Sequence, residues 1–167
     1  MSNRLDILIA LTAHIEGVAP PDYTYTLAGR VHRGKPAFGI EKAGQQFVTI
    51  LEPDDKLDLL PAPNHPDRRS QLWTLELFGV SGTPANANHP TDEAYVLLDD
   101  LRRRIAWINA NTSTAGPGRV PRVLGGLVNG RIASGSGVVL PPDPQQARPT
   151  AVCVLPIDIP LAERIDP

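Results

Sequence analysis

Cysteine is nearly absent from this chain: Cys153 is the only one among 167 residues. A single cysteine excludes an intrachain disulfide and a cysteine-based zinc or iron–sulfur centre, and it fits a reducing compartment or a particle assembled in one. An excess of one charge is lacking too, because 16 lysines and arginines stand against 18 aspartates and glutamates. The net charge of −2 gives no field that would hold a polyanion over the whole surface, which argues against general nucleic-acid binding.

Long apolar runs and aromatic side chains are also scarce. No stretch reaches the ~20 apolar residues that a bilayer span requires, so we expect no membrane partner. Aromatics make up 5% of the chain, whereas 18 prolines and 14 glycines punctuate it. Such punctuation predicts short strands and long ordered connections. A chain of this length usually folds as one unit, and we predict a single domain over residues 1–167.

Two helices are predicted from capping residues and hydrophobic spacing. The first runs from Ser2 and Asn3 to Glu16, and Gly17 ends it. The second spans about residues 91–110, with an acidic first turn that suits the helix dipole. The apolar face of the first helix is expected to consist of Leu5, Leu8, Ile9, Thr12 and Ile15, widened by Ile7 and Leu11. That of the second is expected to consist of Ala94, Leu97, Leu98, Leu101, Ile105 and Ile108.

Strands are predicted where β-branched and aromatic residues cluster between turn signals. Two long loops interrupt them, at about residues 52–70 and 111–122, and Asn129-Gly130 has the composition of a two-residue hairpin turn. The fold class that follows is α+β, with a mainly antiparallel sheet of about five to seven short strands packed with the two helices. The predicted strands cover residues 23–31, 47–51, 71–80, 123–128, 131–133, 138–140 and 151–161.

The last predicted strand carries two prolines on one side, Pro156 and Pro160. Proline has no backbone N–H, so such positions are tolerated in a sheet only where no neighbouring strand needs the donor. We therefore expect this strand to be an open edge that another subunit or partner covers. The candidate contact residues on it are Val154, Ile157 and Ile159.

One aromatic residue does not fit the apolar face of the second helix. At about 100° per residue, Trp107 falls on the polar side, beside Val96 and Arg103. Either the chain after the helix folds back over the indole, or Val96, Arg103 and Trp107 belong to a protein interface, where Trp and Arg are enriched. Asp99 and Asp100 have a simpler expected role, as ion-pair partners of the arginines that follow them on the helix surface.

Basic residues gather in turn segments away from that helix. A local basic patch for DNA or for an acidic protein surface is one interpretation, and solubilisation of the loops is the other. Arg30 and Arg33, which follow the first predicted strand, are the candidates for a partner contact. The basic residues concerned are Arg30, His32, Arg33, Lys35, Arg119, Arg122 and Arg131.

The residues that carry chemistry are scattered along the chain. The four histidines contain no i, i+4 ligand pair on a predicted helix, and no nucleophile elbow or phosphate loop is present. We therefore predict no catalytic, cofactor-binding or metal-binding residue, and a protein that is not an enzyme. The alternative from a different class is a metal-dependent enzyme or small-ligand-binding protein, in which two or more of four residues converge: His32, His65, His89 and Asp54.

Several short stretches together resemble the tail terminator, or tail completion, proteins of tailed bacteriophages. The most specific is NHPTDEAY at residues 88–95, which heads the long predicted helix. The others are RLDILIAL (4–11), LAGRVHRG (27–34), VTILE (48–52), GVVLPPD (137–143) and VLPIDI (154–159).

The resemblance implies an α+β subunit that assembles with copies of itself into a hexameric ring at the head-proximal end of the tail tube. Such a ring ends tube growth, offers a surface to the neck or head, and lets genomic DNA pass without sequence-specific binding. The resemblance thus implies a virion protein, assembled in the host cytoplasm, whose partners are itself, the tail tube protein and a neck or head-completion protein. A head-completion or neck protein of the same joint is the structural alternative.

Overall fold

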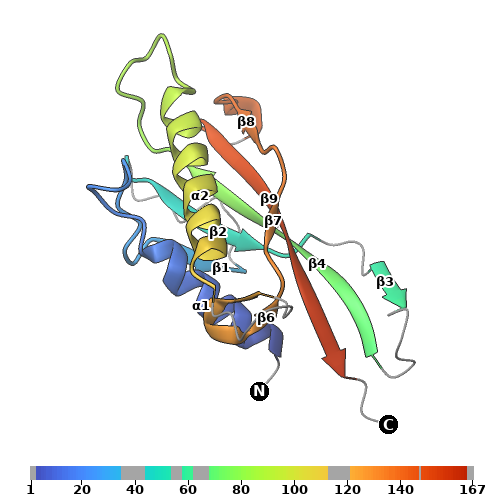
Figure 1. Ribbon diagram of the computed structural model, residues 1–167. Helices are drawn as coiled ribbons and strands as arrows, with labels where there is room; N and C mark the ends of the chain where they lie inside the picture. The colour runs from blue at the N-terminus through green and yellow to red at the C-terminus, as the bar shows by residue number, and fades with distance from the viewer. Residues whose placement is uncertain are drawn as a thin grey trace.

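A computed structural model of the chain describes residues 3–34, 44–53, 58–61, 68–112, 121–146 and 148–164. Within these ranges the protein is α+β, with two helices on one face of a mainly antiparallel sheet (Figure 1), which confirms the predicted class. The helices are α1 (Asn3–Glu16) and α2 (Asp92–Ala110). The strands are β1 (Val31–Arg33), β2 (Phe47–Leu51), β3 (Asp58–Pro61), β4 (Arg68–Val80), β5 (Arg122–Val123), β6 (Val128–Asn129), β7 (Ala133–Ser134), β8 (Val138–Leu140) and β9 (Val152–Arg164).

The sheet is built on one long antiparallel pair, β4 and β9, which are 13 residues each and therefore longer than the short strands expected from composition. Their register runs from Arg68 opposite Arg164 to Val80 opposite Val152. β2 and β3 lie beside β4, while β7 and β8 lie beside β9. Outside β2 lies β1, and this pair is parallel, whereas the other pairings among the described strands are antiparallel. In Figure 1 the far ends of β4 and β9 project beyond the helices.

The main core lies between the helices and one face of the sheet. Alternation along the central strands places Leu75, Leu77, Leu155 and Ile157 on this face, and all four are fully buried. The α2 side of the core consists of the predicted residues Ala94, Leu97, Leu98, Leu101, Ile105 and Ile108. On the opposite face of the sheet lies a smaller cluster, whose buried residues are Phe47, Val80 and Val152.

Helix α1 has the predicted limits, but its buried face is displaced. Ile7, Leu11 and Ile15, spaced four residues apart, are fully buried, whereas Leu5 and Ile9 are exposed. The predicted apolar face of α1 was therefore displaced around the helix from the observed one, although both include Ile15. Apolar residues occur almost all round this helix, so their spacing alone does not select the buried face. Neither helix in the described ranges is long and apolar enough to cross a membrane.

The strand predicted over residues 23–31 is wrong except at its end. Only Val31–Arg33 is a strand, and residues 17–30 form a connection that lies against α2. The reason is visible in the hydrogen bonds: the backbone N–H groups of Thr24 and Tyr25 donate to the carboxylate of Asp100, at 2.9 and 3.1 Å. Donors that a sheet would use are satisfied by a side chain on the helix.

Other connections also differ from the predictions. The loop at 52–70 contains β3 and the first residues of β4, and residues 54–57 and 62–67 lie outside the described ranges. Asn129-Gly130 does not form the hairpin turn. β5 and β6 are joined by a 3₁₀ turn at Leu124–Gly126, and Gly130 follows the hairpin, donating its N–H to the Pro121 carbonyl at 2.7 Å. Most of the loop at 111–122 also lies outside the described ranges.

The prediction that β9 is an open edge is wrong. β9 lies inside the sheet, paired along its full length with β4 and on its other side with β7 and β8. The prolines are accommodated because β7 and β8 leave a gap. The Pro156 carbonyl accepts from Gly135 N–H at 2.9 Å, between those two strands, so the position of the missing donor faces a break in pairing. Pro160 has the same strand parity and lies beyond the end of β7, next to Gly130.

Candidate interaction surfaces

The first candidate surface is the outer face of α2. Val96 and Trp107, 37% and 42% exposed, lie on this face, and the Arg103 side chain is more than half exposed. Tyr95, which directly precedes Val96, is also exposed. The structure thus brings together the three residues that helical phase placed off the apolar stripe, and it adds a second aromatic ring. Exposed Trp, Tyr and Arg are enriched at protein interfaces.

Trp107 is covered partly by α1, not by the chain after α2, as far as the described residues extend. Its ring lies 5.8 Å from the His14 ring, measured between centroids, and the guanidinium of Arg104 lies 4.3 Å from its centroid. The same guanidinium lies 5.8 Å from the Tyr23 ring, and its Nε donates to the His14 carbonyl at 2.6 Å. Arg104 therefore joins the end of α1 to α2 through one hydrogen bond, and its cation–π contacts are with Tyr23 in the connection after α1 and with Trp107 on its own helix.

The position of Arg104 also suits the electrostatics of α1. The last carbonyls of a helix have no partner within it and carry the negative end of the dipole, so a guanidinium donor there is favourable. Burial, together with the charge of Arg104, lowers the pKa of His14 below its ordinary value. Sequence reasoning gave Arg104 only an ion pair on its own helix and missed this contact, because its partner is 90 residues away in the chain.

Asp100 is the second residue that the sequence placed wrongly. It was expected on the helix surface, but only 2% of it is exposed. Besides the backbone donors of Thr24 and Tyr25, it has Arg103 at 3.7 Å as an ion-pair partner, and Arg103 also donates to the Asp22 carbonyl. Asp100 and Arg103 together hold the connection after α1 against α2. The pKa of the nearby Tyr25 is raised mainly by burial and further by the negative charges of Glu93 and Asp100.

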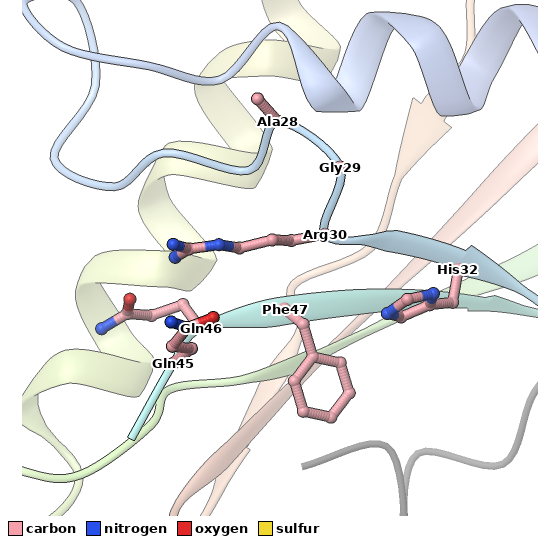
Figure 2. A pocket seen from close by; sticks show the side chains of 7 residues that line it. All are labelled: Ala28, Gly29, Arg30, His32, Gln45, Gln46 and Phe47. Carbon is pink, nitrogen blue, oxygen red and sulfur yellow. The ribbon is translucent and has the colours of Figure 1, made fainter. Parts of the chain in front are cut away.

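The second candidate surface is the β1 edge of the sheet. Arg30 and Arg33 lie at the two ends of this short strand, with Arg33 exposed and Arg30 half-buried. Arg30 and His32 line a pocket of about 270 Å³ with Phe47 (Figure 2). The structure thus joins two members of the predicted basic patch, while Lys35 and Arg119 lie outside the described ranges.

The third group of predicted contact residues does not form a surface. Ile157 and Ile159 of β9 are fully buried in the core, and Val154 is half-buried between Phe78 of β4 and Val138 of β8. They were predicted as contacts because the prolines beside them suggested an open edge. Since β9 is internal, it offers no open edge, and Ile157 and Ile159 are not accessible to a partner.

The described histidines do not converge. His14 contacts Trp107, His32 faces Phe47 with ring centroids 6.0 Å apart, and His89 is exposed in the loop before α2. No group of three His, Cys, Asp or Glu side chains that could hold a metal occurs among the described residues, and His65 and Asp54 lie outside them. Cys153 is buried, as expected for a small apolar residue, and burial raises the pKa of its thiol to about 12.

Comparison with known proteins adds no relationship. No protein-family model matches this chain, and no curated protein matches it significantly.

Proposed function

We propose that this chain is the tail terminator subunit of a tailed bacteriophage. In this proposal copies of the chain form a hexameric ring at the head-proximal end of the tail tube, end its growth and join it to the neck or head. The function is structural and involves no catalysis. The sequence stretches that resemble the family lie at defined places in the fold: residues 88–95 lead into α2, and residues 48–52, 137–143 and 154–159 include β2, β8 and part of β9.

The observation that carries the proposal best is the outer face of α2. A ring requires a heterologous interface, in which one surface of a copy meets a different surface of the next. The α2 face offers exposed Tyr95, Val96 and Trp107 with an exposed carboxylate at Asp99. At one edge of the sheet, β1 and its flank carry Arg30 and Arg33. Because the two surfaces differ, they suit a head-to-tail contact, in which Asp99 of the α2 face, which also carries Arg103, would meet the arginines of the β1 edge.

A substitution on α2 tests this assignment. Val96→Lys places a charge in the proposed contact, and we expect it to weaken ring formation on tail tubes by about tenfold or more, because a buried unpaired charge opposes association. Leu127→Lys is the matched control, since Leu127 has the same 37% exposure but lies in the β5–β6 hairpin. Mass measurement with and without tail tubes, together with thermal unfolding to verify the fold, gives the readout.

Two results would contradict the proposal. One is that the Val96→Lys chain assembles on tubes as well as the Leu127→Lys chain. The other is that the unmodified chain binds an isolated head or neck assembly but never a tail tube, which would favour the head-completion or neck protein instead.

A further inference from the structure

The pocket at the start of β1 and β2 has the composition of an anion site. It is a shallow hollow of about 270 Å³, where Gly29 leads into β1 and Gln46 leads into β2. Figure 2 shows the guanidinium of Arg30 and the amides of Gln45 and Gln46 at one end, with the imidazole of His32 at the other. A Cβ added to Gly29 would meet no atom within 4 Å, so the space beside this residue is open.

Strand alternation explains why these side chains lie on the same face of the sheet. Val31 of β1 and Val48 of β2 point into the core between sheet and helices, and the two are opposite each other in the parallel register. Their neighbours Arg30, His32 and Phe47 must therefore point to the other face. The Arg30 carbonyl accepts from Val48 N–H at 3.0 Å, which fixes the position of the arginine beside Phe47.

The polar groups of this pocket have no partner of their own among the described residues. None of the described residues that line it is acidic, and the side chains of Arg30, His32, Gln45 and Gln46 form no hydrogen bond or ion pair in the described part of the chain. Arg30 is nevertheless half-buried. Its nitrogens are not among the buried side-chain atoms without a partner, so its N–H donors are open to water and to an acceptor that enters the pocket.

We propose that this pocket binds a carboxylate from the surface of a partner protein, the side chain of a glutamate or aspartate. The planar guanidinium matches the two oxygens of a carboxylate, and the amides add donors. The Phe47 ring, almost buried, provides an apolar floor for the short methylene stem. A nucleic-acid phosphate is disfavoured because the chain carries a net charge of −2. The β1 edge is also a proposed ring contact, but the titration below uses the isolated chain and so tests the pocket separately from ring formation.

The test is an NMR titration of the full chain with a short blocked peptide that contains two glutamates. We expect saturable shifts of the His32 ring signals and no comparable shifts with the glutamine version of the peptide. Arg30→Gln should weaken binding about tenfold, because it removes a charge-assisted hydrogen-bond pair. Arg33→Gln changes the net charge equally, yet Arg33 does not line the pocket, so its effect should stay below about twofold.

Three results would overturn the carboxylate assignment. Equal weakening by Arg30→Gln and Arg33→Gln would mean that only the general charge of the edge matters. Equal binding of the glutamine peptide would remove the charge requirement. Tighter binding of inorganic phosphate or a short oligonucleotide at the same signals would identify a phosphate site instead.

Discussion

Asp100 shows what the fold demands of a single residue. Its carboxylate is almost fully buried, yet it accepts two backbone hydrogen bonds from residues 24–25 and faces Arg103. A carboxylate in this position is favourable because it satisfies two partly buried backbone donors and is itself compensated by them and by Arg103. The sequence pointed to this only indirectly: Asp100 lies between Leu97 and Leu101, at the margin of the apolar stripe, while the i, i+4 rule directed attention to surface ion pairs.

Removal of this carboxylate should therefore be costly. We expect Asp100→Ala to lower the free energy of unfolding by about 2–4 kcal/mol, because two backbone N–H groups and Arg103 lose their acceptor. The neighbouring Asp99 is exposed, and Asp99→Ala should change stability by less than about 0.5 kcal/mol. Urea unfolding of both variants measures the difference. Equal stability of the two would show that Asp100 does not fasten the connection after α1.

At the scale of elements, the sequence predicted the helices better than the strands. The period of α2 is long and regular, so its limits and its buried residues are as predicted, apart from Asp100. Strand prediction failed at residues 23–31 and at the edge assigned to β9, since both depend on what lies beside the strand. The prolines of β9 did mark positions without a backbone donor. Such a position needs no free sheet edge here, because the gap between β7 and β8 leaves it unpaired inside the sheet.

The contact between α1 and α2 decides whether alanine at Gly17 stabilises or destabilises the protein, because the Arg104 side chain lies against this glycine. Gly17 does not have a positive φ, so alanine there would ordinarily stabilise the protein by about 0.4–1 kcal/mol through the unfolded state. Here a Cβ would collide with the Arg104 guanidinium, which is fixed by the His14 carbonyl and the Trp107 ring. We expect Gly17→Ala to destabilise the unmodified chain by about 1 kcal/mol.

In an Arg104→Ala background the same substitution should become neutral or stabilising. Thermal or urea unfolding of the four chains gives the coupling between the two positions, and a coupling below about 0.3 kcal/mol would mean that Arg104 moves aside freely. The sequence offered no route to this pair, because the contact joins elements that are far apart in the chain.

At the scale of the molecule, the helices cover one face of the sheet, and the candidate contacts lie on two different surfaces. Helical phase placed Val96, Arg103 and Trp107 on the outer face of α2, where they do lie, and their role in an interface stays a prediction. Arg30 and Arg33, the candidates for a partner contact, lie at the β1 edge, and that contact also stays a prediction. The third set, on β9, was wrong because a sheet edge is decided by the pairing of all strands and not by one strand's residues.

Measurement of tail tube length tests the proposed function most directly. The tail tube protein that the proposal gives this chain as a partner would be polymerised with and without the purified chain, and the tubes would be measured by electron microscopy. The account predicts that the chain binds one end of each tube as a ring and stops elongation there. Tubes that grow to the same lengths, with no chain at either end, would contradict it.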